Sequence, residues 1–392
     1  MEAVYIVAGV RTAIGDFGGS LKDHAPADLG ALVIAEAIRR AGIAPSDVQH
    51  VVMGQVIPTV PKDAYMARVA AVNAGIPVEA PALTLNRLCG SAVQAIISVA
   101  QMLALGEADI AVAGGAEVMS RSPHYVSAAR FGQKMGSVEM VDALIATLSD
   151  PFEGFHMGIT AENIAADHDI TREAQDAAAA ESHVRAARAQ AEGRFADQIL
   201  PIEIKTRKGV VSFDTDEHVR GETTAESLGA LRPAFKKDGT VTAGNASGIN
   251  DGAAALVLAT QKGLDAKGLK PMARILGWGH AGVDPSRMGI GPVKAVPIAL
   301  ERAGLTLDQI DVIEANEAFA AQACAVAKTL GFDPAKVNPN GSGISLGHPV
   351  GATGAIITVK ALYELQRTGS RYGLITMCIG GGQGIALVIE RV

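Results

Sequence analysis

The feature that most constrains the fold of this chain is an internal repeat. Three short segments recur in the same order, at offsets of 262, 260 and 265 residues: Ala37–Ile43 with Ala299–Leu305, Ala95–Val99 with Ala355–Val359, and Ile110–Gly115 with Ile375–Gly380. Helix–strand units often look alike, so one match would mean little, but three in order indicate two copies of one structural unit. We therefore expect two similar halves rather than one irregular core.

Each copy alternates apolar strands with amphipathic helices, which is typical of an α/β sheet. Helices are expected at residues 27–42, 89–105 and 320–330, and strands at 48–53, 82–85, 109–113, 311–314 and 374–377. The more polar residues 121–250, with expected helices at 160–168 and 171–192, form an insertion of the kind that often covers a ligand site. The expected units are residues 1–120 with 251–270, the insertion 121–250, and residues 271–392.

Composition excludes several classes of protein. The 392 residues include 34 basic and 41 acidic side chains, a net charge of −7 with no basic run, so nucleic acid is not an expected partner. Residues 1–7 read as a strand rather than a secretory signal, and no apolar run is long enough to span a membrane. The odd set of three cysteines argues against a disulfide framework and for a reducing compartment, with the cytoplasm as the expected location.

Cys89 is the first candidate catalytic residue. It follows the expected strand 82–85 and opens the expected helix 89–105. Free backbone N–H groups and the positive end of the helix dipole favour a thiolate there, so we expect a pKa below the ordinary value of about 8.5. An inert buried cysteine is the alternative.

A second candidate is His348, which lies in the glycine-rich stretch 341–351. Pro349 suits the first position of a following helix. His348 is then expected at the start of that helix, where positive charge is disfavoured and a neutral imidazole can accept a proton. A structural histidine in a turn is the alternative, and the glycine spacing matches neither a Walker A loop nor a dinucleotide fingerprint.

Two further candidates stand where strands end. Cys378 follows the expected strand 374–377 and precedes Gly380, so its thiol can reach a cleft, although it could equally be a small core residue. Asn316 follows the expected strand 311–314 and can hold a water or an oxyanion, or cap the next helix. Cys324 is expected to pack in the core. No His-x-x-x-His or Cys-x-x-Cys spacing occurs, so a catalytic metal is not expected.

Four stretches together resemble the thiolase family over essentially the whole chain: Asn86–Ser91, Asn316–Ala320, Gly347–Gly351 and Cys378–Gly382. Arg232-Pro233, Val241–Gly248 and His156–Gly158 resemble the branch of bacterial biosynthetic β-ketothiolases that feeds polyhydroxyalkanoate synthesis. The sequence departs from the family at Ala92, where Gly is usual, and at Thr353, where Ser is frequent. Neither change removes a catalytic group.

The resemblance implies a duplicated five-layered αβαβα fold, a loop domain over coenzyme A, and a homotetramer of dimers with contacts at residues 121–145. It implies that Cys89 is acylated while His348 takes its proton, and that Cys378 then deprotonates acetyl-CoA, whose carbanion attacks the acyl-enzyme. The reverse reaction is thiolysis of a 3-ketoacyl-CoA. His348 with a water on Asn316 would stabilise one oxyanion, and the N–H groups of Cys89 and Gly380 the other.

The resemblance also implies a set of substrate contacts, with short linear acyl groups favoured. Ser247 would hold pantetheine, His156 would lie near the thioester, and Arg220 and Ser227 near the nucleotide. The remaining contacts would come from Leu148, Met157, Phe235, Ala243, Ala318 and Phe319. Coenzyme A and acetyl-CoA would be substrates and products, and no permanently bound cofactor is expected.

Three alternatives share parts of this pattern. A decarboxylating ketoacyl synthase would carry His or Asn where Cys378 stands. A non-catalytic relative that only binds lipid or coenzyme A would be expected to have lost Cys89, His348 or Cys378. A thiol redox protein would use Cys89 and Cys378 as a reversible pair. All three groups are present, which favours the acyltransferase.

Overall fold

The core of the molecule is one continuous mixed sheet. The protein is seen in a computed structural model that describes residues 2–207 and 209–392, so Met1 of the expected first strand lies outside it. In sheet order, the strands are β13 (Val312–Ala315), β14 (Tyr372–Ile379), β15 (Gln383–Arg391), β12 (Ala273–Gly282), β1 (Val4–Thr12), β11 (Asn250–Thr260), β5 (Ile110–Val118), β3 (His50–Gly54) and β4 (Ala82–Leu85).

The predicted repeat appears in the pairing of these strands. In the first half, β3 is parallel to β5, and β5, β11 and β1 follow in antiparallel pairs. In the second half, β13 is parallel to β14, and β14, β15 and β12 follow in antiparallel pairs. The halves join through a short antiparallel contact of β1 with β12, from Val4–Ile275 to Ile6–Ala273.

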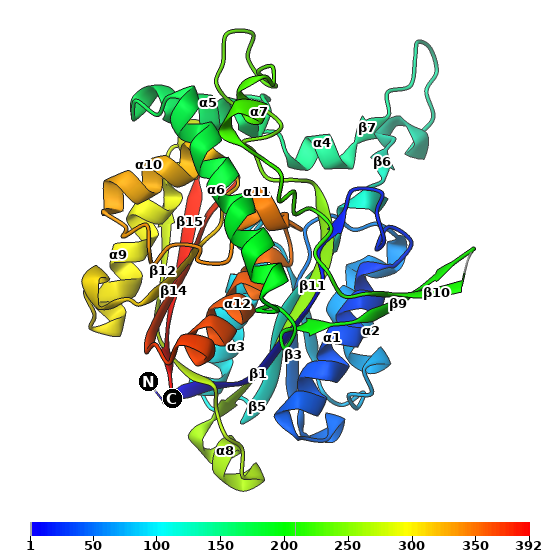
Figure 1. Cartoon of the computed structure of the whole chain (residues 1–392). Helices are drawn as coiled ribbons and strands as arrows, with labels where there is room; N and C mark the ends of the chain where they lie inside the picture. Colours follow the sequence, from blue (N-terminus) through cyan, green and yellow to red (C-terminus); the bar gives the residue numbers. More distant parts are fainter. Residues whose placement is uncertain (1, 208) are drawn as a thin grey trace.

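Helices complete a five-layered arrangement (Figure 1). α1 (Pro26–Ala41) and α2 (Met66–Asn73) cover the outer face of the first half, and α9 (Gly291–Ala303) lies with α10 (Ala320–Leu330) outside the second. α3 (Ser91–Ala104) and α12 (Thr353–Thr368) pack against each other between the halves, and both contact strands of both halves. Because α3 is enclosed on most sides, its sequence is apolar around much of its circumference, whereas α12 buries Thr358, Lys360 and Glu364 beside its apolar residues.

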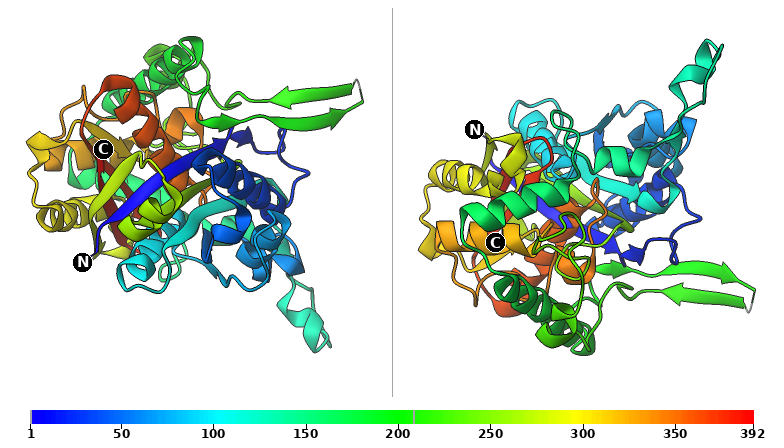
Figure 2. Two further views of the ribbon diagram at one scale, coloured as in Figure 1. Left: turned by 90° about the horizontal axis from the view of Figure 1, so that it is seen from below. Right: turned by 90° about the horizontal axis from the view of Figure 1, so that it is seen from above.

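Much of the insertion lies over one end of the layers, at the top of Figure 1, while its longest helix runs down the front and a hairpin projects to the right. It contains β6 (His124–Tyr125), β7 (Val141–Asp142), α4 (Ala143–Thr147), α5 (Met157–Asp167), α6 (Arg172–Ala191), β8 (Ile199–Leu200), β9 (Ile202–Thr206), β10 (Gly209–Phe213) and α7 (Ala225–Gly229). The β9–β10 hairpin and the β6–β7 segment extend away from the body (Figure 2). A fully buried ion pair, Arg11–Asp216 at 2.7 Å, ties the insertion to β1.

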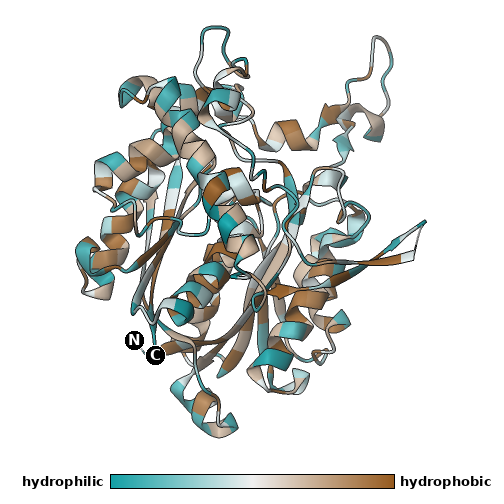
Figure 3. Cartoon of the chain, in the orientation of Figure 1, coloured by the Kyte–Doolittle hydropathy of each residue, from teal (hydrophilic) through white to brown (hydrophobic). Residues whose placement is uncertain are grey.

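Several expected boundaries were wrong, two of them beside the cavity described below. The strand at 109–113 does not close at Gly114 but continues as β5 to Val118, because it stays paired with β11 as far as Asp251. The helix expected from Cys89 begins at Ser91. Apolar residues concentrate on the strands and on the inward faces of the helices, whereas the outer helix faces are polar (Figure 3).

Candidate active site

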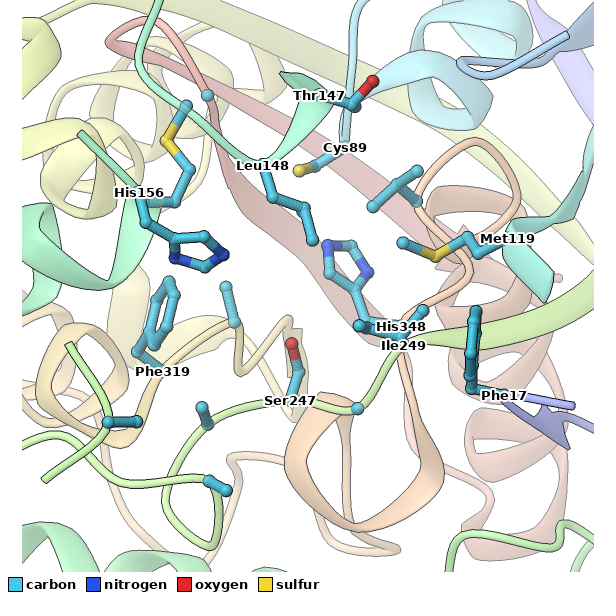
Figure 4. Close-up of a pocket in the computed structure, with 18 of the residues that line it drawn as sticks. Phe17, Cys89, Met119, Thr147, Leu148, His156, Ser247, Ile249, Phe319 and His348 are labelled. Atoms are coloured by element: carbon cyan, nitrogen blue, oxygen red, sulfur yellow. The ribbon is translucent and has the colours of Figure 1, made fainter. Parts of the chain in front are cut away.

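A cavity of about 540 Å³ lies beneath the insertion, where loops from both halves meet (Figure 4). It brings together most residues that the sequence analysis singled out: Cys89, Leu148, His156, Met157, Arg220, Phe235, Ala243, Ser247, Ala318, Phe319, His348 and Gly380. Of the remaining predicted residues, Asn316 and Cys378 are buried just behind this lining, and Ser227 lies exposed on α7, outside it.

Cys89 is held by a tight turn between β4 and α3. Within the turn, the Asn86 side chain accepts a hydrogen bond from the Leu88 N–H at 2.9 Å. Ser91 Oγ accepts one from Arg87 N–H at 2.9 Å and donates one to the Leu88 carbonyl at 2.6 Å. Leu88 itself adopts a left-handed φ of 45°. Such a conformation is costly for a branched residue and persists only where its surroundings enforce it, so the turn fixes the direction of the Cys89 thiol.

The electrostatics of Cys89 differ from the expectation. Burial raises the pKa of the Cys89 thiol above its usual value. Hydrogen bonds from the N–H groups of Gly380 and of Cys89 itself lower it only in part, and the charge of Glu117 raises it further. The predicted lowering was wrong because Cys89 lies two residues before α3, in a desolvated pocket. The resting group is therefore a thiol, and Gly380 N–H points at its sulfur.

The turn of Cys89 packs directly against the end of β14, which carries Cys378. A Cβ on Gly90 would stand 2.5 Å from Ile379 Cδ1, so a larger residue at position 90 would force the Ile379 side chain to move. Burial raises the pKa of Cys378 strongly, and a charge on Cys89 raises it further, as expected for neighbouring sulfurs. Cys378 is 1% exposed and packs with Met157 and Phe319. The two thiols thus come from opposite halves of the repeat to one place.

His348 is buried, and its backbone N–H donates to Asn250 Oδ1 at 2.9 Å. Burial lowers its pKa to about 4, so the imidazole is neutral at pH 7. The sequence analysis also predicted a neutral imidazole for His348. It attributed this state to the start of a helix, however, and that cause was wrong. α12 begins at Thr353 rather than at Pro349, so His348 lies in an irregular loop ahead of the helix.

Hydrogen bonding fixes which nitrogen of His348 carries the proton. Thr353 Oγ1 donates its single proton to the Pro349 carbonyl at 2.9 Å and lies 2.7 Å from His348 Nδ1. The hydroxyl must therefore accept from Nδ1–H. This leaves the lone pair on Nε2, which faces the Asn316 Nδ2 amide at 3.4 Å. The imidazole is thus held as a base toward the cavity.

Asn316 extends β13 by one residue, since its N–H donates to the Thr376 carbonyl of β14 at 3.0 Å. The alternative role as a helix cap was wrong, because Phe319 precedes α10 as its N-cap residue. Asn316 Oδ1 is buried and, within the described part of the chain, has no hydrogen-bond partner. A buried amide oxygen of this kind indicates a place for a water or a substrate group.

Glu117 was missed by the sequence analysis. It is buried at the carboxyl end of β5, where Oε2 accepts from the N–H groups of Val56 at 2.8 Å and Gly351 at 2.9 Å, and Oε1 from that of Ile57 at 3.1 Å. It thereby links the loop after β3 to the loop that carries His348. Burial raises its pKa to about 8, although the three N–H groups act in the opposite direction. The sequence could have drawn attention to Glu117, because it is a charged residue inside an otherwise apolar strand.

One side of the cavity is an aromatic wall. The His156 ring stacks on Phe235 with centroids 4.6 Å apart, and Phe235 meets Phe319 edge-on at 6.1 Å. A Cβ on Gly158 would stand 2.2 Å from Phe235, so the stack requires glycine there. His156 Nδ1 accepts the Gly158 N–H at 3.0 Å, which leaves the proton on Nε2 as a donor. Burial lowers the pKa of His156, so the ring is neutral.

Other expected residues lie at the margins. The Ser247 N–H donates to the Ala318 carbonyl at 2.9 Å, which joins the Val241–Gly248 segment to the loop of Asn316. Arg220 is exposed at the rim. Cys324, half-buried on α10, is outside the cavity, and burial raises its pKa to about 11, which agrees with a packing role.

Among residues 2–207 and 209–392, no group of three or more His, Cys, Asp or Glu side chains is placed to hold a metal ion. In the same part of the chain, no helix has both the length and the apolarity needed to cross a membrane.

Comparison with known proteins covers the whole chain. Residues 4–262 match the family model "Thiolase, N-terminal domain", and residues 269–391 match "Thiolase, C-terminal domain". The chain is 63% identical to "Beta-ketothiolase BktB" of Cupriavidus necator over 390 residues, 99% of each chain.

Solved structures agree. The acetyl-CoA acetyltransferase of Bacillus anthracis superposes with a TM-score of 0.98 at 48% identity, covering 100% of this chain and 99% of that one. Human mitochondrial 3-ketoacyl-CoA thiolase in complex with CoA superposes with a TM-score of 0.97 at 44% identity, covering 100% and 98%.

Proposed function

We propose, since this chain belongs to the thiolase family, that Cys89, His348 and Cys378 carry out a reversible Claisen condensation of acyl-CoA substrates. The chain is an acyltransferase that joins acetyl-CoA to a second acyl group and, in reverse, cleaves a 3-ketoacyl-CoA with coenzyme A. The approach of two thiols beside a neutral imidazole carries the assignment of residues.

In the first half-reaction, Cys89 Sγ attacks the thioester carbonyl carbon while its proton moves to His348 Nε2. The new C–S bond forms as the bond to the coenzyme A sulfur breaks, and that sulfur leaves with the proton from His348. Because burial favours the neutral thiol and the neutral imidazole, proton transfer accompanies the attack rather than preceding it. The N–H groups of Gly380 and Cys89 support the developing oxyanion.

In the second half-reaction, the Cys378 proton passes to His348 Nε2 as acetyl-CoA enters, and the resulting Cys378 thiolate removes a proton from the methyl group of acetyl-CoA. The carbanion attacks the acyl carbon on Cys89, the C–C bond forms, and the C–S bond to Cys89 breaks as the Cys89 sulfur takes the proton from His348, which restores both thiols and the neutral imidazole. A deeply buried thiolate is a strong base, since burial raises the pKa of Cys378. The enolate oxygen would be held by His348 and a water on Asn316, whose free Oδ1 supports this role.

The aromatic wall and the Val241–Gly248 segment provide the proposed path for pantetheine. The acyl thioester would lie beside His156 Nε2–H, with Ser247 further out and Arg220 at the rim. Ser227 lies beyond the cavity on exposed α7, where the nucleotide would reach it. A protein called 3-ketoacyl-CoA thiolase with the same fold binds CoA, which supports this direction.

We also propose that the unit boundaries are those set out above, with the insertion acting as the cover of this path. A cytoplasmic location, the absence of a resident cofactor and a homotetramer with contacts at residues 121–145 belong to the same proposal. Exposed apolar side chains at Phe131, Met135 and Met140 support contacts in that segment. Size-exclusion chromatography with light scattering tests the tetramer.

The experiment for the function is an intact-protein mass measurement after mixing with a panel of acyl-CoAs, paired with initial rates of thiolysis on the matching 3-ketoacyl-CoAs. We expect the mass of one acyl group on Cys89 and thiolysis of the same chain lengths. A protein that neither acquires an acyl group nor cleaves acetoacetyl-CoA would refute the proposal.

A further inference from the structure

The side chain of Asn316 makes few bonds that could hold it in place. Its Nδ2 faces His348 Nε2 at 3.4 Å, and its Oδ1 has no hydrogen-bond partner among the described residues. The position of this amide behind the cavity lining therefore depends on the backbone on either side of it, at Ala315 and Glu317.

One buried side chain holds that backbone on both sides of Asn316. Asn338 Oδ1 accepts from the Ala315 N–H at 2.9 Å, and Asn338 Nδ2 donates to the Ala315 carbonyl at 2.8 Å and to Glu317 Oε1 at 3.1 Å. A carboxamide has two N–H groups, and both are used here. Asn338 is 4% exposed, and polar groups left unpaired at such depth are costly, so these bonds fix the segment that carries Asn316.

Asn338 is itself placed by backbone pairing. Its N–H donates to the Ile313 carbonyl of β13 at 2.8 Å, and the Ile313 N–H donates to the Lys336 carbonyl at 2.9 Å. The φ angle of Asn338 is 46°, a left-handed conformation that asparagine adopts more readily than most residues. The amide therefore reaches Ala315 from a segment that is paired with the same strand.

The surroundings of Asn316 leave its amide sensitive to a shift of this backbone. Glu317 Oε2 accepts from Ser182 Oγ on α6 at 2.6 Å, which ties the far side of the segment to the insertion. A Cβ on Gly343, the first residue of α11 (Gly343–Leu346), would stand 2.7 Å from Asn316 Oδ1. Asn316 thus lies against both α11 and His348, and a backbone shift would move its amide relative to both.

We propose that Asn338 is a positioning residue for carbon–carbon bond formation. It acts through Asn316, which it places to hold the water that stabilises the enolate oxygen. The inference rests on the proposed function and deepens it, because Asn316 serves only the second half-reaction there.

The first half-reaction provides an internal comparison. It uses Cys89 and His348, and His348 is held by hydrogen bonds to Thr353 at 2.7 Å and to Asn250 at 2.9 Å. Neither of these bonds involves Asn338. A change at Asn338 should therefore slow bond formation while acylation continues, whereas a general loss of structure would slow both steps.

The test measures the two steps separately in the same proteins, acylation of Cys89 by acetyl-CoA with rapid-quench mass spectrometry and acetoacetyl-CoA formation by its initial rate. Asn338→Asp keeps the size of the side chain and removes both donors. Asn338→Gly accepts the left-handed backbone and removes the amide, so it guards against misfolding caused by a buried charge. The matched control is Asn340→Asp, the same change at a buried asparagine whose amide contacts Arg194 and Glu364 instead.

We expect both Asn338 variants to lower the rate of acetoacetyl-CoA formation at least tenfold relative to the rate of acylation, since loss of one oxyanion contact commonly costs about 10²–10³ in rate. Acylation itself should stay within about threefold of wild type, and Asn340→Asp should leave the ratio of the two rates unchanged. In a protein that already carries Asn316→Ala, Asn338→Asp should not slow bond formation further, because Asn338 acts through that residue.

Equal loss of both steps, an unchanged ratio in either Asn338 variant, or a full further loss of bond formation in the Asn316→Ala protein would overturn the inference. Wild type that forms no acyl-enzyme or no acetoacetyl-CoA would instead defeat the proposed function, so the two failures are distinguishable.

Discussion

Replacement of Thr353 by valine tests how His348 is held as a base. The hydroxyl of Thr353 accepts from His348 Nδ1–H at 2.7 Å and donates to the Pro349 carbonyl at 2.9 Å, and all three groups are buried. Valine has nearly the same shape but can neither accept nor donate a hydrogen bond through its side chain. The Thr353→Val variant therefore leaves Nδ1–H without a partner in the one tautomer that keeps Nε2 free.

The size of the effect follows from that lost bond. A buried donor left unsatisfied costs about 1–3 kcal/mol, which corresponds to about a 5- to 150-fold shift away from the productive tautomer. We therefore expect acylation of Cys89 by acetyl-CoA to slow by about that factor.

The assay is rapid-quench mass spectrometry of the acyl-enzyme, with urea unfolding measured on the same samples. Thr353→Ser retains the hydroxyl and should stay within a few-fold of the wild-type rate. Acylation by Thr353→Val within twofold of wild type, with an unchanged pH profile, would refute the assignment of the tautomer.

The remaining predictions concern buried charges. Because burial raises the pKa of Glu117 to about 8 from an ordinary value of 4.5, its contribution to the free energy of unfolding is fully present below pH 4.5 and is lost as pH rises through 8. In urea unfolding, the free energy of unfolding of wild type minus that of Glu117→Gln should therefore fall as the pH rises from 4.5 to 8. A difference that rises with pH would contradict the prediction. Lys360→Met removes one partner of a buried ion pair with Glu314 at 2.7 Å and should destabilise the fold by about 3–5 kcal/mol. Lys262→Met, which breaks a largely exposed pair with Asp109, should destabilise the fold much less than Lys360→Met, and equal losses would remove the distinction.

Much of the fold could be predicted because its signals are local and repeated. The helix expected at 27–42 is α1, ended by Gly42 in a left-handed conformation, and the strand expected at 82–85 is β4. The echo of Ile110–Gly115 in Ile375–Gly380 corresponds to β5 and β14, which occupy equivalent places in the two halves. The predicted ends of elements were wrong where pairing with a distant strand decides them, as in the continuation of β5.

Most of the residues that line the cavity could be singled out from the sequence, but the direction of the pKa shift of Cys89 could not. Cys89 and Cys378 stand out as thiols beside glycines, yet the helix argument gave the wrong sign for the pKa of Cys89, since desolvation depends on residues distant in the chain. Phe17 and Ile249 escaped notice because each is a single ordinary residue beside the end of an element. Only the assembled fold shows that these two line the cavity and that Glu117 joins two of the loops around it.

The central claim is that Cys89 carries the acyl group and Cys378 serves the bond-forming step. Its most direct test is peptide mapping of the acyl group after mixing wild type, Cys89→Ala and Cys378→Ser with acetyl-CoA, together with the rate of acetoacetyl-CoA formation. We predict an acyl group on Cys89 in wild type and Cys378→Ser, none in Cys89→Ala, and carbon–carbon bond formation in wild type alone. An acyl group on Cys378, full activity of Cys89→Ala, or equal loss of both steps in Cys378→Ser would contradict the account.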